Sequence, residues 1–414
     1  MGSLVKFEFR KIYKKRMNMV VSCVTIFLIA VFGIANITQS YTYNEKGEKV
    51  SGKLYVKYMK QIAKKSGGEL TNGKAQDILA EYQNMVATPG YYEGKGENGH
   101  FTDEVYCSYF IPHRQILLDI AHVYDDPGMQ TWGSNLDKLS LNDIKPLYKA
   151  KKDRFQMILE AGSGDWNYTT AEKQYWTKRY ARIAEPVTYG YAEGWSTWFD
   201  MAGFFFYVLV GMFIIMSTVY AGEYEQKADH IILTTRYGKS KVVTAKNVAA
   251  FLYGFLLSTA CMLIMALVCF GWYGVEGASL PVQSIYFQSA YPLTNVQAVL
   301  LYVVMCYLAS FMMITMTLWL SARMKNSLSV LAVMLLFAFV PIFMKESMTN
   351  GLYNHILALL PYNAIQDGGY NGILSYPLGF CVLNYMNMRI VVYLILTVII
   401  IPFAGRAFRR HEVQ

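Results

Sequence analysis

The chain has 414 residues, of which 54% are hydrophobic and 16% charged, and its formal net charge is +9. About a quarter of the residues of a soluble protein are charged, so this composition excludes a wholly soluble protein and favours one that lies largely in lipid. The 6 cysteines fall mostly within apolar stretches, which argues against a disulfide framework.

The first predicted element is an amphipathic helix over residues 1–16. Its apolar stripe lies beside a basic cluster in which Glu8 is the single acid. The stripe comprises Val5, Phe9, Ile12 and Tyr13. Such a pattern is typical of helices that lie flat on an anionic membrane surface.

An apolar span is predicted next, at residues 17–38. Its basic start and the small residues Gly33 and Ala35 would also suit a cleaved signal peptide. The uncharged stretch is long for a signal peptide, which favours an uncleaved anchor. Cleavage would leave five spans in the same orientation.

Residues 39–196 are numerous enough for an independent domain. Apolar residues recur there at helical spacing, and few stretches alternate with a period of two. The helical runs are residues 54–62, 78–85, 105–123, 144–159 and 175–183. Ser140 with Asp143, and Thr169 with Glu172, provide N-terminal capping signals for two runs. The pattern predicts a helical extracellular domain.

Five further apolar stretches approach the roughly 20 residues that a membrane-spanning helix needs. They are residues 197–221, 247–273, 295–320, 327–344 and 389–408. The fifth span of the chain, which ends near Pro341, is the shortest. With the first span, they predict an all-α membrane protein with six transmembrane helices. The apolar pieces within residues 345–388 are too short to span and are expected to form an extracellular re-entrant segment, and residues 409–414 a cytoplasmic tail.

The distribution of basic residues predicts the orientation. Lysines and arginines gather before the first span, in residues 222–246, at Arg323 and Lys325, and after the sixth span, whereas residues 274–293 contain none. Because short basic loops stay in the cytoplasm, both termini are expected there, in a multi-pass protein of the plasma membrane. The outer side is then nearly neutral, which argues against nucleic acid as a partner and leaves the lipid bilayer as the expected surroundings.

Motifs for catalysis are missing from the sequence. It contains no His-Glu-x-x-His pair for zinc and no Gly-x-Ser-x-Gly elbow, and His100, His113 and His122 lack the spacing of metal ligands. Gly238-Lys239-Ser240 resembles only the end of a phosphate-binding loop, because Leu233 stands where the first glycine is required. We therefore expect no enzyme activity, no cofactor and no metal.

The central parts of the predicted spans contain no acid or base, which disfavours a carrier driven by protons or sodium. Energy for transport would then arrive from a partner, and the predicted cytoplasmic loop at residues 222–246 suits such a contact. Its apolar residues fall at helical spacing opposite a polar face, which predicts one short amphipathic helix. The apolar set is Tyr224, Ala228, Ile231 and Ile232, and the polar set is Glu225, Gln226, Lys227, Asp229 and His230. The helix is either a surface connector or a docking element.

Several features of this loop resemble the membrane subunits of type-2 ABC exporters. The residues that carry the resemblance are Glu223, Glu225, Thr234, Thr235, Gly238, Lys239 and Lys246. The predicted spans, flat N-terminal helix and re-entrant segment also resemble that family. The resemblance implies that the short helix is a coupling helix in a groove of an ATPase subunit. It further implies a second permease subunit, identical or related, and a set of ATPase-coupling residues. These are Glu223, Glu225, Asp229, Arg236, Lys239 and Lys246.

The favoured function is therefore the permease of an ATP-driven exporter, for an amphipathic, peptide or lipid-like substrate. The alternative is a membrane-anchored receptor or scaffold that acts through its extracellular domain, although one span would suffice as an anchor. An intramembrane protease is disfavoured, because the spans offer no paired acids, zinc ligands or Ser/His set.

Overall fold

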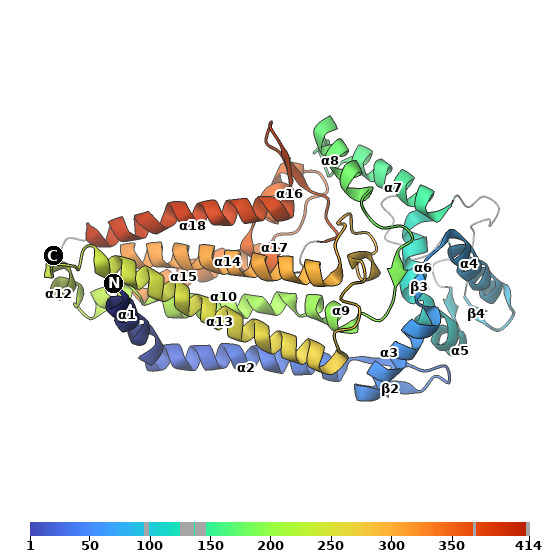
Figure 1. The fold of residues 1–414 in the computed structure, drawn as a ribbon, viewed down its shortest axis with the longest axis horizontal. Coiled ribbons are helices and arrows are strands. Elements are labelled where there is room, and N and C mark those ends of the chain that lie inside the picture. The colour runs from blue at the N-terminus through green and yellow to red at the C-terminus, as the bar shows by residue number, and fades with distance from the viewer. Residues whose placement is uncertain (95–98, 125–135, 137–145, 367–369, 411–414) are drawn as a thin grey trace.

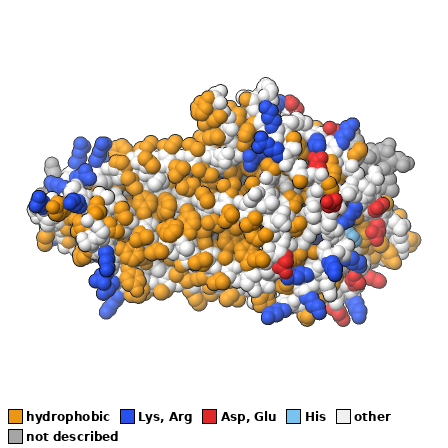
Figure 2. Space-filling view, in the orientation of Figure 1, with side chains coloured by type: hydrophobic (Ala, Val, Ile, Leu, Met, Phe, Trp, Pro, Cys, Tyr) orange, Lys and Arg blue, Asp and Glu red, His pale blue; other side chains and the backbone are white. Residues whose placement is uncertain are grey.

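The computed structural model describes residues 1–94, 99–124, 136, 146–366 and 370–410. Long helices lie side by side along the long axis, with both termini at one end and a separate domain at the other (Figure 1). We call these the basic end and the domain end, and the domain at residues 40–192 the inserted domain. Figure 2 shows apolar side chains over the helical part, Lys and Arg at the basic end, and mixed charges over the inserted domain.

Within the described part of the chain, five segments are long and apolar enough to cross a membrane. Four are single helices: α2 (Arg16–Gln39), α13 (Lys241–Tyr273), α14 (Asn295–Arg323) and α18 (Tyr385–Arg409). The fifth, Glu193–Glu225, comprises α9 (Glu193–Asp200), η3 (Ala202–Phe204), α10 (Phe205–Ser217) and α11 (Ala221–Glu225). Most begin several residues before the predicted spans, because the helices continue beyond their most apolar parts.

The remaining predicted span is shorter than the other five in the structure. It consists of α15 (Ser327–Phe339) and a 3-10 turn, η5 (Val340–Phe343). Pro341 has no backbone N–H and its ring obstructs the preceding turn, so the α-helix ends before it. Five segments of spanning length are therefore found among the described residues, and the sixth span remains a prediction.

The inserted domain is mainly helical, as the sequence predicts. Its helices are α3 (Gly52–Ser66), α4 (Asn72–Ala87), α5 (Asp103–Val105), η2 (Tyr106–Phe110), α6 (Ile111–Tyr124), α7 (Leu147–Ala161) and α8 (Thr170–Tyr180). The capping box of Thr169 and Glu172 is confirmed, whereas Ser140 and Asp143 lie outside the described residues. A hydrophobic core distinct from that of the spans is built around Leu79, Leu117 and Ile120.

Short antiparallel strand pairs were not predicted. They are β1 (Tyr41–Tyr43) with β2 (Lys49–Ser51), β3 (Gly68–Glu69) with β6 (Thr188–Tyr189), β4 (Tyr92–Glu93) with β5 (His100–Phe101), and β7 (Ser375–Pro377) with β8 (Val382–Asn384). Strands of two or three residues are too short to show a period of two in the sequence.

The segment before α18 links the two parts of the molecule. Its helices α16 (Gly351–Ala358) and α17 (Pro361–Gln366) are too short to span a membrane, in agreement with the prediction. The α17 helix packs against α10, α14 and α15, while β7 packs against α8 of the inserted domain. One segment thus contacts both the span bundle and the inserted domain.

Candidate functional site

The loop between α11 and α13 lies at the basic end, where both termini are found (Figure 1). The sequence predicts a single helix that includes Tyr224 and Ile232, and this prediction is wrong. The α11 helix ends at Glu225, and a separate helix, α12 (Asp229–Thr234), follows. Lys227 adopts the left-handed conformation, with φ of 55°, so the helix cannot continue through it.

A cluster of four charged side chains, three of them buried and Lys11 exposed, joins three distant segments at this end. Lys246 Nζ of α13 lies 2.5 Å from Glu223 Oε1 of α11 and 2.9 Å from Glu8 Oε2 of α1 (Gly2–Lys14). Lys11 Nζ lies 2.5 Å from the same Glu223 oxygen. Lys246 is only 1% exposed and Glu223 2%. Buried charges require such pairing, because an isolated one would lose its hydration without compensation.

Lys15 stands beside this cluster, at the junction of α1 and α2. Burial lowers the pKa of its ammonium group, while the carboxylate of Glu225 opposes that shift and Lys11 adds to it. With Glu223 and Gln226, Lys15 lines a cavity of about 50 Å³ between α1 and α11. The N-terminal helix is therefore held against the loop by charge as well as by packing.

Glu225 binds a different helix. Its Oε1 accepts hydrogen bonds from the backbone N–H and the hydroxyl of Ser327, both at 2.7 Å. A carboxylate at the first turn of α15 satisfies an otherwise unpaired N–H group and interacts favourably with the helix dipole. Glu225 thus connects the loop to α15.

The threonines and the glycine of the loop shape the turn after α12. Thr235 Oγ1 donates to the carbonyl of Ile232 at 2.7 Å, and Gly238 N–H donates to the carbonyl of Thr235 at 3.1 Å. A Cβ atom at Gly238 would lie only 1.7 Å from the Ile232 carbonyl oxygen. Glycine is therefore required here by the close approach of two backbone segments.

The six predicted site residues separate into three groups. Glu223, Asp229 and Lys246 are buried, Glu225 caps α15, and Arg236 and Lys239 are exposed. The predicted place of Asp229 on an exposed polar face is wrong, because the break at Lys227 rotates α12 relative to α11. Ile231, which is 72% exposed, lies on the outer face of α12 instead.

Several residues that support this loop were not singled out from the sequence. The hydroxyl of Ser321 in α14 accepts from the backbone N–H groups of Tyr220 and Ala221 at 3.1 and 2.9 Å, and donates to the carbonyl of Ser217 at 2.6 Å. Tyr220 Oη also donates to Asn247 Oδ1 at 2.8 Å. Glu8 could have been recognised from the sequence, because it is the single acid of a basic segment. No feature of the sequence pointed to Ser321.

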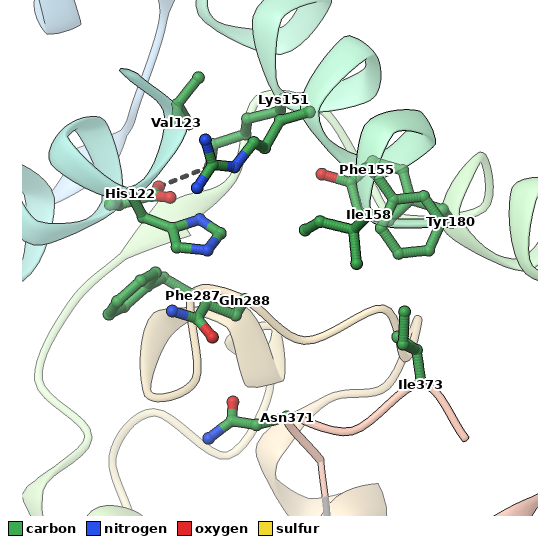
Figure 3. A pocket seen from close by; sticks show the side chains of 12 residues that line it. His122, Val123, Lys151, Phe155, Ile158, Tyr180, Phe287, Gln288, Asn371 and Ile373 are labelled. Atoms are coloured by element: carbon green, nitrogen blue, oxygen red, sulfur yellow. Dashed lines mark hydrogen bonds and ion pairs between the residues drawn. The ribbon is translucent and has the colours of Figure 1, made fainter. Parts of the chain in front are cut away.

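A second polar site lies between the inserted domain and the loops that follow α13 and α17. It is a cavity of about 160 Å³ with His122 of α6 and Lys151 of α7 on one side, and Phe287, Gln288 and Asn371 on the other (Figure 3). Burial, with the positive charge of Arg154, lowers the pKa of His122 to about 4. Lys151 is 2.5 Å from Asp119, whose carboxylate also accepts from the Tyr189 hydroxyl at 2.6 Å.

Within the described residues, no group of three His, Cys, Asp or Glu side chains is arranged to hold a metal ion. The basic end instead combines a short helix that is exposed on one face with buried links to α1, α10, α13 and α14 and an exposed link to α15. Such an arrangement is suited to transmitting a displacement of the loop to several helices at once.

The family model described as ABC-2 family transporter protein matches residues 3–413. No curated protein matches the chain, and no solved structure does. Members of this family are membrane permeases that carry no catalytic domain and work with an ATPase partner. The match runs from α1 through α18, and the chain therefore belongs to the ABC-2 transporter family, as a multi-pass membrane permease.

Proposed function

We propose that this permease forms the translocation path of an ATP-driven exporter and receives energy at α12. The observation that carries this proposal is the contrast within the loop. Its outer face exposes Ile231, Arg236 and Lys239, whereas Leu233 on its inner face belongs to the core of the spans. A partner can contact the outer face, and the inner face would transmit the resulting motion to the core of the spans.

The burial of some of the six coupling residues and the exposure of others imply different roles for them. Arg236 and Lys239 would meet the ATPase. Glu223 and Lys246 would act through the protein, because their ion pair fastens the start of the loop to the start of α13. Motion of α12 would then displace α10 and α13 together, as a rigid-body switch.

The positions of the termini support six crossings. The α1 helix and the end of α18 both lie at the basic end, which requires an even number of crossings, and the described residues contain five long segments (Figure 1). The α15–η5 segment, Ser327–Phe343, supplies the sixth, because 17 residues extend for roughly 26 Å, close to the hydrocarbon thickness of about 30 Å. The basic end is then cytoplasmic, and the inserted domain extracellular, in the plasma membrane.

Two permease copies, or one copy and a relative, would enclose the path above two ATPase subunits. The amphipathic, peptide or lipid-like class of substrate agrees with spans that are rich in apolar and aromatic residues. Substrate would cross the membrane when the helix bundles of the two permease subunits rotate relative to each other. ATP binding in the ATPase subunits would drive this motion.

The coupling role of the loop is tested by charge reversal at its exposed face. Lys239→Glu combined with Arg236→Glu is expected to reduce permease-stimulated ATP hydrolysis at least tenfold in nanodiscs that contain the co-purified ATPase. Lys325→Glu is the control, because Lys325 is also an exposed lysine at the basic end but lies between α14 and α15. Equal activity in the loop variant and the control would refute the coupling role.

A receptor or scaffold that acts through the inserted domain is the second candidate, and the separate core of that domain favours it. The two functions differ in their partners. An ATPase that co-purifies from native membranes supports the exporter, whereas partners that bind only the inserted domain support the receptor.

A further inference from the structure

A cavity of about 590 Å³ lies where the inserted domain meets the spans. Its walls come from β1, α3 and α6 and from the start of α9. Pockets of this size accept small organic ligands, which usually bind among apolar and aromatic side chains with a few polar groups. Under the proposed orientation the cavity is at the extracellular ends of α2 and α9, where an exporter releases its substrate.

Tyrosines dominate the lining of this cavity. The six are Tyr41, Tyr43, Tyr55, Tyr106, Tyr189 and Tyr191. Two of these rings already attract ammonium groups of the chain itself. Lys49 Nζ lies 4.1 Å from the centre of the Tyr41 ring, and Lys60 Nζ lies 5.1 Å from that of Tyr191. The negative faces of such rings stabilise cations, and more strongly away from water.

Charge in the cavity favours the same type of ligand. Of the described residues that line it, Glu193 is the acid and Arg114 the base. Glu193 is half-buried, and its Oε2 accepts a hydrogen bond from Tyr55 Oη at 2.9 Å, whereas Arg114 is exposed. Because water screens the exposed guanidinium more than the half-buried carboxylate, the charge of Glu193 acts more strongly within the cavity than that of Arg114.

We propose that this cavity binds an amphipathic organic cation, with its charged group against Glu193 and its apolar body on the tyrosine rings. Tyr55 fixes the carboxylate and offers its ring beside it. The role of the cavity as an exit site for substrate rests on the proposed exporter function, whereas binding itself does not require the ATPase.

Binding is tested with the permease alone in nanodiscs, using benzyltrimethylammonium as the cation and benzylsulfonate as an anion of similar size. Isothermal titration should detect the cation and not the anion. Glu193→Gln is expected to weaken cation binding at least tenfold, because it removes the charge and preserves the shape. Glu160→Gln, at an exposed acid of α7 outside the cavity, should have no effect.

A second variant separates binding from folding. Arg114→Gln removes the opposing charge and should strengthen cation binding about twofold or more, a gain that a misfolded protein cannot give. Equal affinity in wild type and Glu193→Gln, or equal binding of the anion, would overturn the proposal. If the cation binds but the permease does not couple to an ATPase, the cation-binding site is retained and the proposed exporter function is rejected.

Discussion

At the basic end, two glutamates and two lysines from α1, α11 and α13 share one cluster in which only Lys11 is exposed, whereas at the domain end the inserted domain meets the segments between the spans through separate hydrogen bonds and apolar contacts. Examples at the domain end are Ser375 Oγ to Glu172 Oε1 at 2.9 Å and Gln115 Nε2 to the Ile285 carbonyl at 3.1 Å. Removal of one charge is expected to destabilise the whole cluster, because the remaining buried charges lose a partner. The junction at the domain end can lose one bond and keep the others.

This difference agrees with the proposed flow of energy through the molecule. A site that receives a displacement must be stiff, or the motion is lost locally. A junction above the proposed exit site would have to separate, and its separate hydrogen bonds can break one at a time. Single substitutions at the two ends measure how far they differ.

The largest effect is expected for Lys246→Met at the basic end. Removal of this ammonium leaves Glu8 and Glu223 buried with only Lys11 to compensate, and breaking a buried pair in this way costs about 3–5 kcal/mol. The free energy of unfolding in mixed micelles measures the loss. Lys241→Met, an exposed lysine of the same helix, is the control. Addition of Glu8→Gln to the Lys246→Met variant should recover part of the lost free energy of unfolding. No recovery would contradict the proposed coupling of these charges in one cluster.

The next largest effect is a loss of stability in acid that arises from His122. The folded-state pKa is about 4, below the ordinary 6.5, so the unfolded chain binds an extra proton between these values. Stability therefore falls as the pH drops through that window, by up to about 3 kcal/mol. The melting temperature at pH 7.5 and at pH 4.5 measures this change.

His122→Phe should remove most of that pH dependence, because the ring contact with Phe287 is kept without a titratable group. His100→Gln, at an exposed histidine of the inserted domain, serves as the comparison. A pH dependence that persists in His122→Phe would assign the acid sensitivity to other groups.

A smaller effect is expected at the domain end from Ser375→Ala. The variant deprives the buried Glu172 of one donor, which costs about 1–3 kcal/mol, but the capping bonds of Glu172 to Thr169 remain. Hydrogen exchange in β7 and β8 should accelerate about tenfold. Ser329→Ala, at an exposed serine of α15, is the control, and equal exchange in both variants would show that the bond is dispensable.

The smallest effect is expected for Lys60→Met, which removes an exposed ion pair with Glu276 between the inserted domain and the loop after α13. Pairs of this kind contribute about 0–1 kcal/mol. The melting temperature should change little, and the change should shrink further in high salt. A loss as large as that of Lys246→Met would remove the distinction between the two ends.

The sequence predicted the long helices well, because about 20 apolar residues in lipid have few alternatives to a helix. The short helices of the inserted domain also followed from their spacing. The helix through Tyr224 and Ile232 was predicted wrongly, because its spacing is helical and only the φ of Lys227 reveals the break. The strand pairs were not predicted because strands of two or three residues show no period of two, and one pair also joins residues distant in the chain, Gly68 and Tyr189.

The coupling role of the loop remains a prediction. The loop, its glycine and its lysines were visible in the sequence, and the structure adds which of them are buried and which are exposed. Burial of Glu223 and Lys246 was not visible, since it depends on α1 folding back over α13.

Composition and local pattern by themselves determined that this protein lies in a membrane, where its long helices run and which loop carries the basic residues. These are properties of consecutive residues and their solvation. Tertiary structure decided which charges pair, where α12 is exposed and where the tyrosine-lined cavity opens. Those features arise from contacts between residues up to 238 positions apart, such as Glu8 and Lys246, whose energies depend on burial that no local pattern specifies.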